Sequence, residues 1–143
     1  MKAITLHQPW ASLVAVGAKQ IETRSWKPPL MLLGERIAIH AGQKLISNPG
    51  SDFDDLVARY LGDDWQITIP RGAVVATAIL KSRYPMTSTN RLIWPDGDER
   101  SFGDYRVGRW MWNLADVIPL DPPKPARGFQ RLWTWRIDHD HDC

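Results

Sequence analysis

The sequence contains a single cysteine, Cys143, and no disulfide can therefore form within the chain. We expect a cytoplasmic protein, because a reducing compartment favours chains without disulfides. No run approaches the ~18 apolar residues of a membrane-spanning helix, and the N-terminal apolar stretch is too short for a signal peptide. The sequence also lacks a P-loop, a zinc-ligand spacing and a glycine-rich dinucleotide fingerprint. These absences predict a soluble protein with no membrane partner, no cofactor and no metal site.

The length of 143 residues, with 43% hydrophobic residues, is typical of one globular domain. We expect a single domain over residues 1–138, without internal repeats, followed by a short disordered tail over residues 139–143. The tail contains two histidines and two aspartates, which are residue types that bind metals. A terminal pentapeptide is rarely a structured metal site, so no metal is assigned to it.

Charged residues are distributed in blocks along the chain. Basic residues are in excess in one set of segments and acidic residues in another: 1–49, 70–94 and 105–137 are basic, and 50–69, 95–104 and 138–143 are acidic. The basic blocks coincide with the segments predicted below to form a sheet. If the acidic blocks lie at the periphery, the sheet presents a positive field that favours phosphate-bearing ligands. The alternative is an even mixture of surface charges without a patch.

Alternating or continuous apolar residues indicate strands in six segments. These segments are 2–7, 19–24, 34–41, 72–84, 110–118 and 132–137. Two helices are predicted, one opened by Pro9 and ended by Gly17, and one over Ser51–Leu61 with Ser51 as its N-cap. Residues 85–103 are expected to form a flexible loop, and the prolines of 119–130 are expected to exclude regular structure. The pattern predicts an α+β fold, a small mixed β-barrel with two main helices.

Three charged residues lie within six positions of each other: Lys19, Glu22 and Arg24. A strand with a period of two places Glu22 and Arg24 on one face, and Lys19 joins them only from a preceding turn or through a bulge. With Trp10 and Trp26 nearby, this set predicts a ligand-binding cleft. In it, a cation contacts a phosphate or carbonyl oxygen, a carboxylate contacts a base edge or a proton, and a tryptophan provides a wall on which a base stacks. The alternative is an exposed strand face with a Glu22–Arg24 ion pair.

Other candidates are less specific. Arg127 and Gly128 belong to a proline-bordered loop with Phe129, a composition that suits close approach to a ligand or an exposed turn. His40 lies near the end of a predicted strand and either reaches the cleft or is a buried structural histidine. Four tryptophans form two pairs with a spacing of two, and each pair packs in the core or lines a cleft: Trp110, Trp112, Trp133 and Trp135.

The N-terminal part of the sequence resembles the ASCH domain family. Gly17, Lys19, Glu22 and Arg24 match every fixed position of the family signature G-x-K-x-x-E-x-R, and the run from His7 to Ser12, His-Gln-Pro-Trp-Ala-Ser, precedes it. The similarity covers roughly residues 1–44 and 105–137. The N-terminal part is most similar to the ASCH domain of the activating signal cointegrator, a transcription coactivator.

The resemblance implies a PUA-like β-barrel whose cleft binds RNA, single-stranded nucleic acid or a modified nucleoside, and it identifies no protein partner. Arg24 is expected to contact phosphate or brace Glu22, Lys19 to neutralise an oxygen, and Glu22 to accept a hydrogen bond from a base. The full set of predicted ligand-binding residues is Gln8, Trp10, Lys19, Glu22, Arg24, Ser25, Trp26, His40, Arg127 and Gly128.

The resemblance also implies an alternative function. Some relatives are amidohydrolases that deacylate acetylcytidine with a lysine, a threonine and a distant glutamate. Lys19 matches that lysine and would act as a base or nucleophile, with Glu22 moving the proton; Glu22 occupies the threonine position, and Thr23 is one residue away. No residue aligns with the distant glutamate, and Arg131 stands where relatives often have glycine. A ribonuclease and a protein-interaction module with a vestigial cleft are further alternatives.

Overall fold

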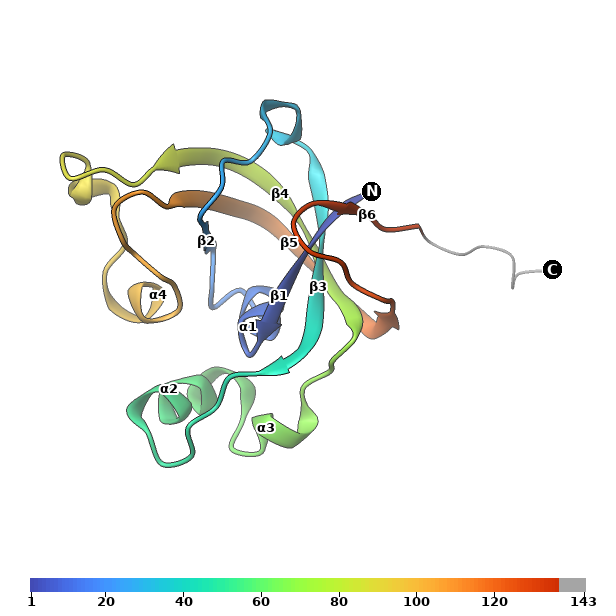
Figure 1. The fold of residues 1–143 in the computed structure, drawn as a ribbon. Coiled ribbons are helices and arrows are strands. Elements are labelled where there is room, and N and C mark those ends of the chain that lie inside the picture. The colour runs from blue at the N-terminus through green and yellow to red at the C-terminus, as the bar shows by residue number, and fades with distance from the viewer. Residues whose placement is uncertain (137–143) are drawn as a thin grey trace.

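Six strands form one mixed sheet in a computed structural model that describes residues 1–136 (Figure 1). The strand order is β2-β5-β4-β3-β1-β6. The strands are β1 (Lys2–Gln8), β2 (Ile21–Arg24), β3 (Arg36–Leu45), β4 (Ala73–Pro85), β5 (Trp110–Pro125) and β6 (Trp133–Thr134). Only β1 and β3 pair in parallel, and the other neighbours are antiparallel. The predicted α+β class and the six strands are confirmed.

The sheet curves towards a barrel but does not close, because its two end strands, β2 and β6, do not pair with each other. Both end strands are short, with four and two residues. Across the open side, the Arg24 guanidinium on β2 donates a hydrogen bond of 2.8 Å to the backbone carbonyl of Thr5 on β1. Because β6 pairs only with Lys2 and Ala3, the rest of β1 has a free edge, and the barrel is open along a seam between β2 and β1.

Both predicted helices are present, as α1 (Trp10–Ala15) and α2 (Asp52–Leu61). The Ser51 hydroxyl caps α2 by accepting from the backbone N–H of Asp54, as the N-cap pattern predicts. Short helical segments also occur in the connections. These are η1 (Leu30–Leu32), α3 (Trp65–Thr68), η2 (Arg91–Ile93) and α4 (Gly97–Ser101).

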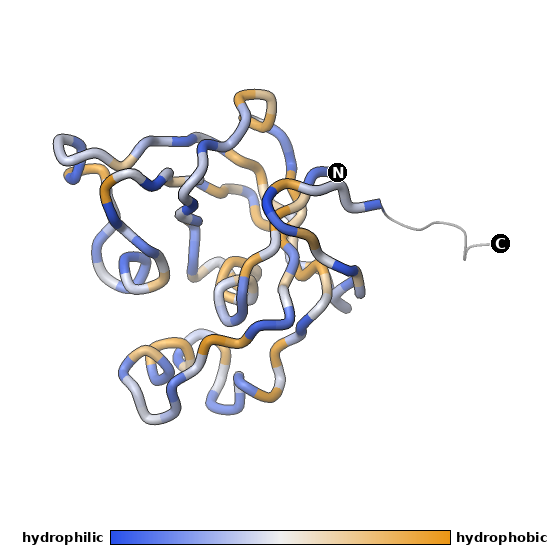
Figure 2. The backbone as a smooth tube through the Cα atoms, in the orientation of Figure 1, coloured by the Kyte–Doolittle hydropathy of each residue, from blue (hydrophilic) through white to orange (hydrophobic). Residues whose placement is uncertain are grey.

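The core lies between the curved sheet and α1. Its centre consists of fully buried side chains from β1, β3, β4, β5 and α1, such as Ile4, Val14, Ile39, Leu80 and Trp112. Figure 2 shows hydrophobic residues along the central strands, α1 and the η1 turn, and hydrophilic residues along β2 and in other peripheral segments. Of the four paired tryptophans, three are buried and Trp110 is partly buried against the main core, so these residues pack rather than line a cleft.

The prediction that residues 119–130 lack regular structure is wrong for the first half of that segment. Strand β5 continues to Pro125, and Pro119 and Pro125 lie opposite Ala76 and Ala73 of β4. The register shifts between these two pairs, so Leu120–Pro123 form an irregularity in the strand. Beyond Asn113 only β4 pairs with β5, and prolines are tolerated at such a free edge and at bulges.

Residues 85–103 are not a featureless loop. They contain η2 and α4, and three of their apolar side chains are buried: Met86, Trp94 and Phe102. Phe102 packs with Leu13 of α1 and Trp65 of α3. The polar composition of the segment does not indicate that these three side chains are buried. Their burial holds α4 beside the open seam.

None of the helices described for residues 1–136 is long and apolar enough to cross a membrane. The predicted tail over 139–143, the metal-ligand residue types within it, and the end of the last predicted strand at Ile137 lie outside the described residues.

Two leucines allow a matched test of the core. Leu80 is fully buried, whereas Leu92 is fully exposed. We expect Leu80→Ala to lower the free energy of unfolding by about 2–5 kcal/mol, because it leaves a cavity. Leu92→Ala should change that free energy by less than about 0.5 kcal/mol. Urea denaturation of the two variants measures both values, and equal effects would contradict this description of the core.

Candidate functional site

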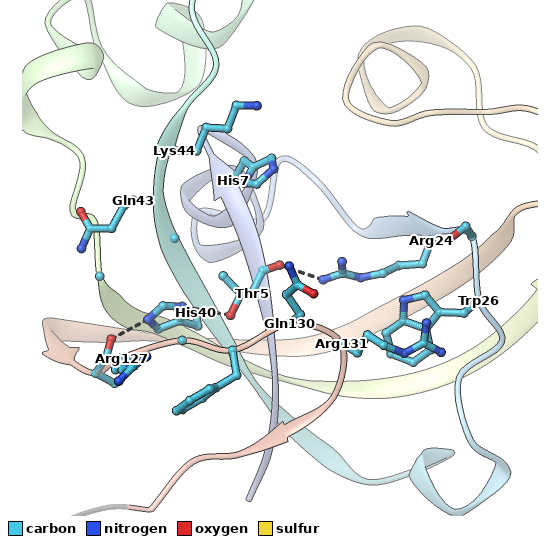
Figure 3. A pocket seen from close by; sticks show the side chains of 16 residues that line it. Thr5, His7, Arg24, Trp26, His40, Gln43, Lys44, Arg127, Gln130 and Arg131 are labelled. Atoms are coloured by element: carbon cyan, nitrogen blue, oxygen red, sulfur yellow. Dashed lines mark hydrogen bonds between the residues drawn. The ribbon is translucent and has the colours of Figure 1, made fainter.

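The open seam leads into a cavity of about 870 Å³, which we call the basic pocket (Figure 3). Its sixteen lining residues come from β1, the end of β2 and the residues after it, β3, the residue before β4 and the connection between β5 and β6. They are Thr5, His7, Arg24, Ser25, Trp26, His40, Gly42, Gln43, Lys44, Gly72, Ala126, Arg127, Gly128, Phe129, Gln130 and Arg131. The pocket therefore joins both ends of the chain, which lie next to each other only in the folded protein.

The lining of the basic pocket contains cations but no carboxylate. The cations are Arg24, Lys44, Arg127 and Arg131, and two histidines accompany them. Partial burial and the neighbouring cations Lys44 and Arg24 lower the pKa of His7, which is therefore neutral at pH 7. A pocket with this lining attracts anions, since no negative side chain within it offsets the positive field.

A chain of hydrogen bonds holds the floor of the basic pocket. His40 bonds through Nε2 to the carbonyl of Ala126 at 2.7 Å and through Nδ1 to the Thr5 hydroxyl at 3.2 Å. The Ala126 carbonyl only accepts, so Nε2 carries the proton and Nδ1 accepts from Thr5. The Thr5 oxygen accepts in turn from the indole N–H of Trp133 at 3.0 Å. Burial lowers the pKa of His40, which favours this neutral form.

Gly128 packs directly on this floor. A Cβ atom at position 128 would lie 2.4 Å from Cε1 of His40 and 2.7 Å from the Thr5 hydroxyl oxygen, distances that real Cβ atoms do not show. Only glycine lets the backbone of the 126–131 loop approach the imidazole this closely.

Arg131 completes the wall opposite His40. Its guanidinium lies 4.7 Å from the centre of the Trp26 ring, a cation–π distance, and its backbone has the positive φ of 58°. A glycine would adopt this φ without strain, whereas arginine costs about 1 kcal/mol or more, a cost that the Trp26 contact helps to offset.

Lys19 lies in the turn before β2 and is fully buried beneath Glu22. Its ammonium donates to the carbonyls of Ile21 and Phe102, each at 2.6 Å, and lies 3.6 Å from a Glu22 oxygen. Burial lowers the pKa of Lys19, although Glu22 opposes this shift. Lys19 lines neither this cavity nor the next one, and the oxygens that it neutralises belong to the protein itself.

A second cavity of about 450 Å³, which we call the carboxylate pocket, adjoins the first. Its twelve lining residues are Thr5, Leu6, His7, Trp10, Glu22, Thr23, Arg24, Ser101, Phe102, Gly103, Asp104 and Arg109. The Thr23 hydroxyl accepts from the backbone N–H of Asp104 at 3.0 Å, which ties β2 to the segment after α4. Arg24 belongs to both pockets, and its Nε lies 3.5 Å from a Glu22 oxygen.

The predicted site residues thus lie in the basic pocket, in the carboxylate pocket or in neither. Arg24, Ser25, Trp26, His40, Arg127 and Gly128 line the basic pocket, and Trp10, Glu22, Thr23 and Arg24 line the carboxylate pocket. Lys19 and Gln8 line neither. Gln8 is buried and bonds to Ser12 and to the carbonyl of Pro70, so it joins β1 to α1 and to the segment before β4.

Several site residues had no sequence signal. Lys44 lies on β3 beyond the predicted strand end at residue 41, and Asp104 belongs to no motif. His7 and Arg109 belong to segments that resemble the family, but neither was predicted to line the site. Glu99 of α4 lies beside Lys19 and accepts from the backbone N–H of Gln20 at 2.6 Å, and burial raises the pKa of Glu99. Within residues 1–136, no three metal-binding side chains cluster to form a metal site.

Comparisons with known proteins point to one family. The family model of the ASCH domain matches residues 4–124. The crystal structure of ASCH from Zymomonas mobilis is similar in fold, with 20% identity, a TM-score of 0.60, and coverage of 99% of this chain and 90% of that protein. A mutant form of the same protein gives 20% identity and a TM-score of 0.58, with coverage of 94% and 89%. At this identity the likeness shows the fold, and it confirms the expected PUA-like architecture. No curated protein matches the chain by sequence.

We expect Gly128→Ala to displace the 126–131 loop, because the added methyl group meets the His40 ring. The substitution should lower the free energy of unfolding by about 1–3 kcal/mol, the usual cost of overpacking. It should also change the NMR signals of the His40 imidazole, since the bond to Ala126 is lost. Gln130→Ala, at an exposed position of the same loop, serves as the control. Unchanged His40 signals in Gly128→Ala would show that the loop does not pack as described.

Proposed function

Because the chain belongs to the ASCH domain family, which is matched over residues 4–124, we propose that it binds single-stranded RNA through the basic pocket. The observation that carries this proposal is the lining of that pocket, with four arginine and lysine side chains and no carboxylate. Phosphate neutralisation by such side chains supplies most of the affinity in non-specific RNA binding. A protein-interaction module with a vestigial cleft requires no such concentration of charge.

Aromatic side chains at the pocket support a nucleic acid as the ligand rather than a small inorganic anion. Trp26 is half-buried with Arg131 over its ring, and Phe129 is 52% exposed and lies beneath the guanidinium of Arg127. Each aromatic ring therefore lies beside an arginine. An unpaired base stacks favourably on an aromatic ring or on a guanidinium plane, and the phosphate of the same nucleotide can contact the arginine charge.

The contacts of Arg24 suit a phosphate-binding role. One of its terminal nitrogens bonds to the Thr5 carbonyl and its Nε faces Glu22, so the guanidinium is held at the boundary of the two pockets. An arginine held in this way loses little conformational entropy when it binds a phosphate.

The surroundings of Lys19 do not favour the amidohydrolase alternative. A lysine nucleophile needs a free lone pair aimed at the substrate carbonyl. The Lys19 ammonium instead donates to two protein carbonyls and is fully buried, with no face on either pocket. Its geometry suits a positioning role, in which it holds the Glu22 carboxylate and joins β2 to the segment after α4.

We expect a short, unstructured single-stranded RNA to bind with an affinity that falls as salt rises. On a logarithmic plot the slope should be about −0.7 for each phosphate neutralised. Arg127→Gln should reduce the steepness by about 0.7, whereas Lys81→Gln, which removes an exposed charge outside both pockets, should leave it unchanged. Fluorescence anisotropy across a salt series measures these slopes.

Two results would contradict RNA binding through the basic pocket. One is an affinity that does not depend on salt. The other is an equal loss of slope in Arg127→Gln and Lys81→Gln, since this would spread the interaction over the whole surface.

For the amidohydrolase alternative we expect no turnover. Incubation of the wild-type protein with acylated cytidines should leave their ultraviolet absorbance unchanged, because the Lys19 ammonium donates to two protein carbonyls and lines neither pocket. Deacylation by the wild type that disappears in Lys19→Arg, while RNA binding persists, would establish the catalytic lysine and overturn our interpretation of Lys19.

A further inference from the structure

The two pockets adjoin each other and differ in electrostatic character. Thr5, His7 and Arg24 belong to both linings, so the two pockets lie side by side with these three residues between them. The basic pocket has no carboxylate, whereas Glu22 and Asp104 line the carboxylate pocket. Because Arg24 and Arg109 also line the carboxylate pocket, its charges balance, and a phosphate is favoured in the basic pocket over the carboxylate pocket. A ligand that fills both therefore has an anionic part and a neutral part that donates hydrogen bonds.

The Glu22 carboxylate has capacity for such a donor. Its side chain is 13% exposed, and its oxygens lie 3.6 Å from the Lys19 nitrogen and 3.5 Å from Nε of Arg24. These distances exceed the 2.7–2.9 Å or so of a charge-assisted hydrogen bond, so the two cations fix the carboxylate mainly through charge. Lone pairs of Glu22 remain available to a ligand in the pocket.

Asp104 provides a second carboxylate in the lining of the same pocket. Hydrogen bonds from Arg106 keep the pKa of Asp104 below its usual value, so its carboxylate is ionised at neutral pH. Its side chain is 40% exposed, and one oxygen lies 3.6 Å from Nε of Arg109. Two carboxyl groups, those of Glu22 and Asp104, thus line one small cavity.

Trp10 gives the carboxylate pocket a flat apolar wall. The ring is half-buried and packs against Phe53 of α2 at 6.0 Å, which leaves the indole little freedom to move. A planar ring between such a wall and carboxylate acceptors is the usual arrangement for an unpaired base.

We propose that the carboxylate pocket is a base-selective subsite, which holds the base next to the phosphate bound in the basic pocket and prefers bases with an exocyclic amine over uracil. This inference rests on the proposed RNA binding and adds the selectivity. Adenine, cytosine and guanine each carry an amine that donates to a carboxylate. Uracil has two carbonyl oxygens on either side of a single N–H, and these oxygens repel the carboxylates of Glu22 and Asp104.

Cytosine and uracil provide the sharpest test, because they differ only on the pairing edge. The probes are the 5′-phosphorylated trinucleotides of cytidine and of uridine, and titration calorimetry at fixed salt and neutral pH measures both affinities. We expect the cytidine trinucleotide to bind about tenfold more tightly, within the range of discrimination known for amine–carboxylate contacts.

Three variants separate selectivity from overall binding. Glu22→Gln should reduce the ratio of the two affinities towards one, because the amide also donates to uracil. Asp104→Asn provides a second test at a more exposed site, since Glu22→Gln leaves the buried Lys19 with less compensating charge, and thermal denaturation establishes that both variants fold. Arg127→Gln should weaken both trinucleotides equally and keep the ratio.

Each outcome bears on one of the two proposals. Equal affinities of the wild type for both trinucleotides would overturn the base-selective subsite and leave RNA binding intact. A preference for cytidine that persists in both Glu22→Gln and Asp104→Asn would also overturn it. No binding of either trinucleotide would overturn RNA binding itself, and the subsite with it. A preference that falls in either carboxylate variant and survives in Arg127→Gln supports the subsite.

Discussion

The open seam between β2 and β1 is the feature on which both pockets depend. A barrel gains backbone hydrogen bonds by closing, but β2 has four residues and β6 has two, which is too little strand to complete the ring. The side chain of Arg24 spans part of the gap by bonding to the Thr5 carbonyl. Because a side chain rather than a strand makes this connection, space remains on both sides of it, and the basic and carboxylate pockets occupy that space.

The buried ammonium of Lys19 stabilises the position of β2 at the open seam. Removing an ammonium from water costs several kcal/mol, and two carbonyls and a carboxylate offset that cost here. One of these carbonyls belongs to Phe102, which is distant in sequence, so the same ammonium holds the segment after α4 against β2. The signature lysine thereby fixes the position of Glu22, and Glu22 in turn faces Arg24 across the boundary of the pockets.

The predictions that succeeded rest on local periodicity. Strand β1 and helix α2 were predicted from alternation and from apolar spacing, and Ser51 was predicted as a cap from its position. The predictions that failed depended on partners that no local pattern contains. The prolines of β5 are tolerated because only β4 pairs with that part of the strand, and α4 is held by the burial of Phe102 among residues of α1 and α3. A polar, proline-rich composition does not contain that information.

The same distinction between local pattern and tertiary contacts applies to the candidate site. The sequence by itself determined which charged residues accompany β2, and the signature of Gly17, Lys19, Glu22 and Arg24 indicated the family, because these features are contiguous in the chain. Only the tertiary structure decided that Lys19 points into the protein while Glu22 and Arg24 face cavities, since this depends on the Phe102 carbonyl. It also brought Lys44 and Arg131 into one pocket with Arg24, and it placed Gly128 on the His40 ring. Residues distant in sequence share a site only when the sheet curves, and that curvature is a property of all the strands together.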